Sequence, residues 1–190
     1  MKIKVGVLFG GKTVEHEISI ISAIQAMGYL NRDKYDVIPI YITKNNEFYV
    51  GENASSVVRR FLDNFESKWT ADYSKQAKEL GMTIDEVVTL ASIIQAEAAN
   101  TQDMYIISAV LHNRLRDGAY RDIYVLGCDP TTYYPYKRAE DLPAGMENFI
   151  STYDTYTIEG LPAGPICSPS KDALLAALNP NPDYYNYYYF

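Results

Sequence analysis

The stretch TIDEVVTLASIIQAEAAN, residues 83–100, decides the fold of the carboxyl-terminal part of this chain. Thr83 followed three residues later by Glu86 is the pattern of a capping box, which starts a helix. At about 100° per residue, Glu97 falls beside Leu90 and Ile94, at the border of an apolar stripe. The sequence thus predicts an amphipathic helix with one carboxylate at the edge of its buried face. Apolar residues recur in it at helical spacing: Ile84, Val87, Val88, Ala91, Ile94 and Ala98.

A carboxyl group at the border of an apolar stripe loses part of its hydration. This desolvation raises a carboxyl pKa, so that Glu97 could hold a proton near neutral pH and act as a general acid. The alternative is a glutamate on the helix surface whose methylene stem covers apolar neighbours. Periodicity alone leaves both interpretations open.

Five sequence blocks follow this helix in one order. They are HNRL at residues 112–115, CDPTTYY at 128–134, STYDTY at 151–156, GLPAGPI at 160–166 and ALLAALNP at 173–180. Their order and spacing resemble the catalytic domain of the endolytic murein transglycosylases, the YceG-like or MltG family. The resemblance runs from about residue 55 to residue 190, and five blocks make it far more specific than any single motif. It implies a YceG-like catalytic domain of the α+β class.

In that family the helix typically reads ASI-(I/V)-x-x-E, and the resemblance implies that Glu97 is the catalytic acid. Many relatives carry a second acid two residues earlier, where this chain has Gln95, which cannot transfer a proton. In the implied reaction Glu97 protonates the oxygen that links N-acetylmuramic acid to N-acetylglucosamine. Its carboxylate then takes a proton from the muramic acid C6 hydroxyl as that hydroxyl attacks C1. The product is a 1,6-anhydro end, and no metal or organic cofactor is required.

The resemblance also implies a glycan-binding groove beside the acid helix. Two residues of the next predicted helix and four loop residues would line it: Asn113, Arg114, Asp129, Thr131, Tyr153 and Tyr156. Arg114 or Asp129 could instead form a structural ion pair. The chain has 18 tyrosines, which suit a glycan because the ring stacks on sugar C–H faces and the hydroxyl bonds sugar hydroxyls. A tyrosine excess without function is the alternative.

The first fifty residues follow a different pattern. MKIKVGVLFGGKTVEHEISIISAIQAM, residues 1–27, and DVIPIYITKNNEFYVG, residues 36–51, resemble the opening strands, glycine turn and first helix of D-alanine–D-alanine ligases. The run KVGVLF predicts a short buried strand. The glycines at residues 10 and 11 permit a tight turn before a helix whose free N–H groups suit an anion. In the ligases, the residues matching Glu15, His16 and Ser19 help to hold the first D-alanine.

We therefore predict a chimera. Residues 1–52 would be a small β-α-β ligase-like fragment of the α/β type, and residues 53–190 a YceG-like lytic transglycosylase catalytic domain truncated at its carboxyl end. No phosphate-binding glycine loop follows residue 52 and the ATP-grasp domains are missing, so ATP-dependent ligation is not expected. Two alternatives to a working transglycosylase stay open. One is an inactive glycan-binding fragment of that family, and the other is a ligase-like module that binds D-alanine without ATP-grasp activity.

Composition excludes several classes of function. The net charge of −7 and the isoelectric point near 4.8 come without a basic stripe, so a nucleic-acid partner is not expected. Cys128 and Cys167 lack metal spacing, and His16 and His112 are the only histidines, so no zinc cluster can be assembled. A nucleophilic pair of Cys128 and His112 is a formal alternative to two small packed cysteines. The expected partner is the glycan strand of peptidoglycan.

Localisation is expected from the apolar pattern and from the resemblance. No apolar run approaches the ~20 residues of a membrane span, and the amino terminus has a strand pattern in place of a signal peptide. The transglycosylase family is extracytoplasmic and normally anchored by one amino-terminal helix, whereas this chain, as written, is expected to stay in the cytoplasm. Relatives also carry a LysM-like subdomain before the catalytic part and continue past the YYYF of residues 187–190.

The other elements are predicted from periodicity and from helix breakers. We expect one or two helices over residues 55–80, a helix over residues 102–116 and a last helix over residues 171–178. Between residues 118 and 169, prolines, glycines and tyrosines predict loops and short strands. The final YYYF resembles the start of the last strand of the family.

Overall fold

The computed structural model describes residues 2–12, 16–51, 54–118 and 123–190. The chain divides into two compact units, Met1–Thr70 and Ala71–Phe190. Helix α2 (Ala54–Lys68) belongs to the first unit. The boundary between the packed units therefore lies after Thr70, later in the chain than the boundary at residue 52 that the sequence resemblance predicts. The chimera boundary at residue 52 stays a prediction, because packing does not record ancestry.

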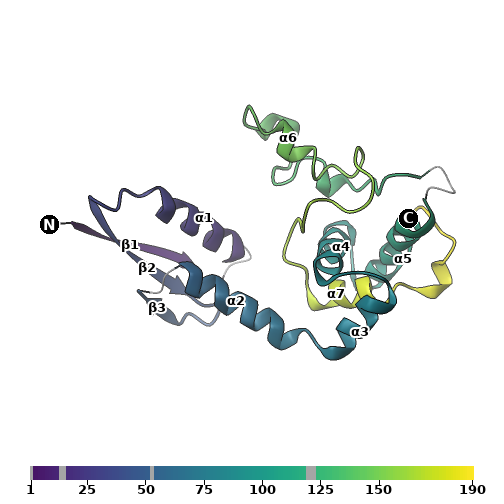
Figure 1. Ribbon diagram of the computed structural model, residues 1–190, viewed down its shortest axis with the longest axis horizontal. Coiled ribbons are helices and arrows are strands. Elements are labelled where there is room, and N and C mark those ends of the chain that lie inside the picture. Colours follow the sequence, from purple (N-terminus) through teal and green to yellow (C-terminus); the bar gives the residue numbers. More distant parts are fainter. Residues whose placement is uncertain (1, 13–15, 52–53, 119–122) are drawn as a thin grey trace. The chain divides into compact units, whose positions relative to one another are not determined.

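The first unit is a small three-stranded sheet with two helices (Figure 1). Strands β1 (Ile3–Gly10) and β2 (Tyr35–Ile42) are parallel neighbours separated in sequence by α1 (His16–Tyr29). Strand β3 (Phe48–Val50) pairs antiparallel with β2. The predicted β-α-β order with a further extended piece is therefore confirmed.

One face of this sheet carries the core of the first unit. Phe9, Tyr41 and apolar residues of α1 form a buried cluster, and the ring of Phe61 on α2 lies edge-on to Tyr41 at a centroid distance of 6.0 Å. On the opposite face of β1, Leu8 is 61% exposed. The prediction of a buried first strand is thus wrong for one face. Successive side chains of a strand point to opposite faces, and the core lies on the face that carries Phe9.

The second unit is built on three helices that pack against one another (Figure 1). Helix α4 (Ile84–Glu97) contacts both α5 (Thr101–Asp117) and α7 (Lys171–Leu178), and α3 (Ala71–Glu79) packs against α4 and α7. The predicted helices are confirmed, with boundaries shifted by only a few residues. In the part of the chain that the structure describes, every helix is too short or too polar to span a bilayer.

Local chemistry explains where α4 begins and how it is held. The Thr83 hydroxyl accepts from the Glu86 N–H at 3.2 Å, and the Glu86 carboxylate accepts from the Thr83 N–H at 2.7 Å, so the predicted capping box is formed. Leu90 and Ile94 are fully buried, as the apolar stripe requires. The start of α4 is therefore fixed by its cap, and the turns that lead to Glu97 are fixed by packing.

The segment between α5 and α7 is mostly irregular. It contains the short helices η2 (Asp129–Thr131), η3 (Ala139–Asp141) and α6 (Glu147–Ile150), and an isolated bridge joins Val125 to Glu159. Loops are thus confirmed, whereas the expected short strands are reduced to one bridge within the described residues.

The strand expected at the carboxyl end is not formed. After η4 (Pro182–Tyr184), residues 187–190 form no strand. A strand needs a hydrogen-bonded neighbour, and the described part of this unit offers these residues none.

Candidate active site

Glu97 is the last residue of α4, and its side chain is half-buried. Burial raises the pKa of the Glu97 carboxyl, and the negative charge of Asp129 raises it further. Hydrogen bonding from the Asp129 backbone and from Cys128, together with the charge of Arg114, opposes the rise. The expected direction of this pKa shift is confirmed. The carboxyl group consequently keeps its proton to a higher pH than an exposed glutamate does.

Two of the sequence blocks are joined by a buried pair of threonines. The hydroxyls of Thr131, in CDPTTYY, and Thr155, in STYDTY, lie 2.8 Å apart. The Thr131 hydroxyl donates to the Cys128 carbonyl at 2.6 Å and accepts from the Thr155 N–H at 3.1 Å, while the Thr155 hydroxyl accepts from the Cys128 N–H at 2.9 Å. Both threonines are fully buried. This network fixes the turn that presents Asp129.

Asp129 and Tyr156 form an accessible pair beside Glu97. The Tyr156 hydroxyl donates to the Asp129 carboxylate at 2.6 Å. This hydrogen bond is the main cause that raises the pKa of Tyr156 to about 12, so the phenol keeps its proton and stays a donor. Both side chains are exposed, Tyr156 to 51%. They lie in electrostatic range of Glu97 and are open to a ligand.

The positive charge of Arg114 on α5 also acts on the Glu97 carboxyl group. Its Nε donates to the Tyr188 carbonyl at 2.7 Å, and its Nη1 donates to the Leu126 carbonyl. Gly127, which follows Leu126, has a φ of 60°, a value that favours glycine. The partners of Arg114 are backbone carbonyls and aromatic rings, which disfavours the alternative of a structural ion pair.

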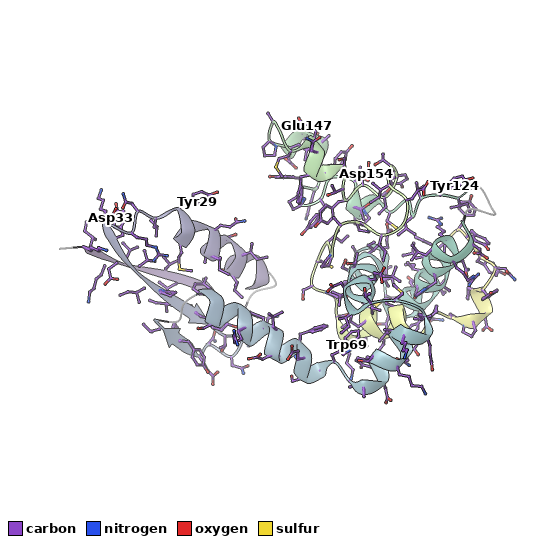
Figure 2. The ribbon with its side chains drawn as sticks, viewed as in Figure 1. Tyr29, Asp33, Trp69, Tyr124, Glu147 and Asp154 are labelled. Carbon is purple, nitrogen blue, oxygen red and sulfur yellow. The ribbon has the colours of Figure 1, made fainter. Side chains whose placement is uncertain are left out.

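The other three predicted groove residues have structural partners. Asn113 is buried and donates to the carbonyls of Tyr184 at 2.8 Å and Tyr187 at 2.7 Å. Tyr153 lies in an aromatic cluster, with ring centroids 4.7 Å from Tyr134 and 5.1 Å from Phe149. Asp154, next to Tyr153, lies in the loop that follows α6 (Figure 2). The structure thus brings Arg114, Asp129 and Tyr156 to Glu97 and gives Asn113, Thr131 and Tyr153 supporting positions.

Two residues of α4 that the periodicity did not single out hold the segment from the end of the GLPAGPI block to the start of α7. The buried Ser92 hydroxyl accepts from the Ile166 N–H at 2.9 Å, and the Gln95 side-chain oxygen accepts from the Ser170 N–H at 3.1 Å. A serine inside an apolar stripe was the available signal, because a buried hydroxyl requires a partner. Gln95 therefore has a structural contact with a residue far away in the sequence.

The nucleophilic pair of Cys128 and His112 is not formed. His112 Nε2 lies 2.8 Å from the Ala177 carbonyl, and burial lowers the pKa of His112. Burial raises the pKa of the Cys128 thiol to about 12, and the charge of Glu97 adds to that rise. A thiol with such a pKa is not a nucleophile near neutral pH. Within the described ranges, no group of three or more His, Cys, Asp or Glu side chains could hold a metal ion.

The ligase-like residues are only partly described. The Ser19 hydroxyl accepts from the Gly10 N–H at 3.1 Å, which ties α1 to the glycine turn. Glu15 and the side chain of His16 lie outside the described residues.

The chain matches a known protein family over most of its length. The model of the YceG-like family matches residues 11–190. The chain belongs to the YceG-like family. The transglycosylase resemblance of the sequence blocks is thereby confirmed. The match also begins ahead of residue 52, so it overlaps the segment that resembles the ligases.

Individual relatives of this YceG-like chain cover parts of it. An endolytic murein transglycosylase of Streptococcus pneumoniae serotype 2 is 34% identical over 109 residues, which are 56% of this chain and 20% of that protein. A D-alanine–D-alanine ligase of Thermosipho africanus is 54% identical over 50 residues, which are 26% of this chain and 14% of the ligase. The crystal structure of a YceG-like protein from Listeria monocytogenes aligns with a TM-score of 0.57 and 26% identity, over 76% of this chain and 47% of that one. The chain thus spans a fifth or less of these two curated relatives.

Proposed function

We propose that this YceG-like chain is an endolytic lytic transglycosylase that cleaves peptidoglycan between N-acetylmuramic acid and N-acetylglucosamine. The observation that carries the proposal is the half-buried Glu97 carboxyl, whose pKa is raised, beside the accessible pair of Asp129 and Tyr156. Family membership supports the substrate class, because the pneumococcal relative is named an endolytic murein transglycosylase.

In the proposed mechanism one carboxyl group serves twice. The protonated Glu97 gives its proton to the glycosidic oxygen as the bond from that oxygen to the muramic acid C1 breaks. The Glu97 carboxylate then accepts the proton of the C6 hydroxyl, whose oxygen forms the new bond to C1. The negative charge of Asp129 favours the protonated form of Glu97 before the reaction. The same charge favours the positive charge that develops at C1 in the transition state.

The surrounding residues divide into two roles in this proposal. Asp129, Tyr156 and Arg114 contact the glycan, because they lie around Glu97 and are at least partly accessible. Asn113 and Thr131 act as positioning residues, because both are buried and their polar groups bind backbone groups. Tyr153 supports the loop that carries Tyr156 through its aromatic neighbours.

Muropeptide analysis tests the proposed reaction. Incubation of purified sacculi with the chain should create new glycan ends that mass spectrometry identifies as anhydro-muramic acid. These ends are expected both on released fragments and on the remaining sacculi. Internal cleavage should shorten long glycan strands before monomeric products accumulate. If the strands keep their length distribution and no anhydro ends form, the proposal fails.

The charge of Asp129 should be visible in the pH dependence of cleavage. Because Glu97 must be protonated, kcat/KM should fall as pH rises through its raised pKa. Asp129→Asn removes one of the causes of that rise, so the alkaline limb of the profile should move to lower pH. Arg114 and Cys128 also face the carboxyl group and are unchanged in this variant.

The exposed Glu159 in the same unit provides a control for this pH profile. Glu159 is not among the groups that shift the pKa of Glu97, so Glu159→Gln should leave the alkaline limb in place. If the alkaline limb of the kcat/KM profile stays in place in Asp129→Asn, or moves to higher pH, Asp129 does not raise the pKa of Glu97.

A further inference from the structure

The carboxyl-terminal tyrosines line an open groove, the tyrosine groove, formed by Ile123, Asn186, Tyr187, Tyr188 and Tyr189. Its volume of about 420 Å³ falls within the range of roughly 300–1,000 Å³ that is common for small-molecule sites. Tyr187 is 56% exposed and Tyr189 is 73% exposed, so part of each ring is accessible to a ligand, although Tyr187 also packs against Tyr184 and Arg114 lies over Tyr189.

Side chains of α5 hold the backbone of the tyrosine groove. Asn113 donates to the Tyr184 and Tyr187 carbonyls, and Arg114 donates to the Tyr188 carbonyl. The Arg114 guanidinium also lies 5.4 Å from the centroid of the Tyr189 ring, within cation–π distance. These contacts hold the backbone of the groove in place. The protein would therefore lose little conformational entropy when a ligand binds.

Arg114 also connects the tyrosine groove to the candidate active site. The guanidinium that holds Tyr188 and Tyr189 donates to the Leu126 carbonyl, two residues before Cys128, and its charge acts on Glu97. One side chain therefore contacts the groove on one side and the segment beside the acid on the other. A chain-like ligand bound at Glu97 could extend into the groove.

We propose that the tyrosine groove is a second sugar-binding subsite, which holds a residue of the glycan strand outside the pair that is cleaved. The inference rests on the proposed function, because it takes the ligand at Glu97 to be a glycan strand. Tyrosine rings stack on the C–H faces of sugars, and the Asn186 amide can bond hydroxyl and acetamido groups. Among the residues that the structure describes, those that line the groove are uncharged, which fits a neutral N-acetylated sugar.

Binding to a variant that cannot cleave tests the subsite without relying on catalysis. In a Glu97→Gln background, calorimetry would compare peptide-free glycan strands of two and of eight sugars. Adding Tyr187→Ala and Tyr189→Ala should weaken binding of the long strand by about tenfold, the effect of ~1.4 kcal/mol. The disaccharide, which fills only the site at Glu97, should bind with unchanged affinity.

Tyr29 at the end of α1 offers a matched control (Figure 2). It is 91% exposed, and Tyr29→Ala in the same background should leave the affinity for both strands unchanged. Tyr189→Ser alone, at the most exposed tyrosine of the groove, repeats the test with a single substitution. Unchanged long-strand affinity in both groove variants overturns the subsite, as does an equal loss for the disaccharide. Tight binding of the long strand by a wild-type chain that does not cleave it refutes the proposed function and leaves the subsite standing.

Discussion

Replacing Glu97 with glutamine should abolish the formation of anhydro ends and leave the fold intact. Glutamine keeps the shape of the side chain but cannot donate a proton, and loss of a general acid typically costs ~10²-fold or more in rate. The half-buried position of Glu97 at the end of α4 also favours a neutral side chain over a charged one. Muropeptide analysis gives the rate, and circular dichroism with thermal unfolding checks the fold.

Gln95 is the matched control for this experiment, because it lies one half-turn earlier on the same helix. Gln95→Ala removes an acceptor for the Ser170 N–H and no proton donor. We expect a stability loss of about 1 kcal/mol and a cleavage rate close to that of the wild type. A Glu97→Gln variant with full activity would exclude Glu97 as the catalytic acid, whatever the behaviour of Gln95→Ala.

The largest effect on stability should come from Thr131→Val. Valine has nearly the same shape but no hydroxyl, so the buried Thr155 N–H is left without its acceptor, whereas the Cys128 carbonyl loses one donor and keeps the Thr131 N–H. Each buried polar group left without a partner costs about 1–3 kcal/mol. Cleavage should fall as well, because the turn that presents Asp129 is no longer fixed. Chemical denaturation would measure the free energy of unfolding.

Thr132, the next residue in the same block, supplies the comparison for Thr131. It is half-buried, whereas Thr131 is fully buried. We expect Thr132→Val to change the free energy of unfolding by well under 1 kcal/mol, as is usual for positions outside buried networks. Equal stability of the two variants would show that the threonine network does not hold the two blocks together.

The helix that carries Glu97 could be predicted because its signals are local. The capping box at Thr83 and the apolar spacing through Ile94 lie within one short segment, and both depend only on helix geometry. The raised pKa of Glu97 could be anticipated in direction for the same reason, since its first cause is burial beside that stripe. Its second cause, the charge of Asp129, comes from a separate loop.

The rest of the site depends on contacts between segments far apart in sequence. Thr131 and Thr155 are separated by 24 residues, and no periodicity indicates that their hydroxyls meet. Sequence resemblance placed Thr131 and Asn113 in the groove, but it cannot distinguish a residue that contacts a ligand from one that holds the backbone behind it. The proposed positioning roles of Thr131 and Asn113 rest on their burial and on their hydrogen bonds to backbone groups, which only the structure shows.

In the first unit as well, the sequence predicts the strand but not the burial of its faces. The apolar run of β1 indicates a strand, but the number of its faces that are covered depends on which other elements pack against the sheet. The exposure of Leu8 opposite the core therefore could not be derived from the run itself. The same reason applies to the YYYF segment, whose apolar and aromatic character does not supply the neighbouring strand that pairing requires.

The most direct test of Glu97 as a single acid and base is mass spectrometry of the chain ends formed in oxygen-18 water. We predict anhydro-muramic acid ends without oxygen-18, because the C6 hydroxyl of the same sugar attacks C1 and water takes no part. In Glu97→Gln, both the protonation of the glycosidic oxygen and the deprotonation of the C6 hydroxyl should be lost. Reducing ends that carry oxygen-18 would contradict the mechanism, since they would show that the site activates water and hydrolyses the strand.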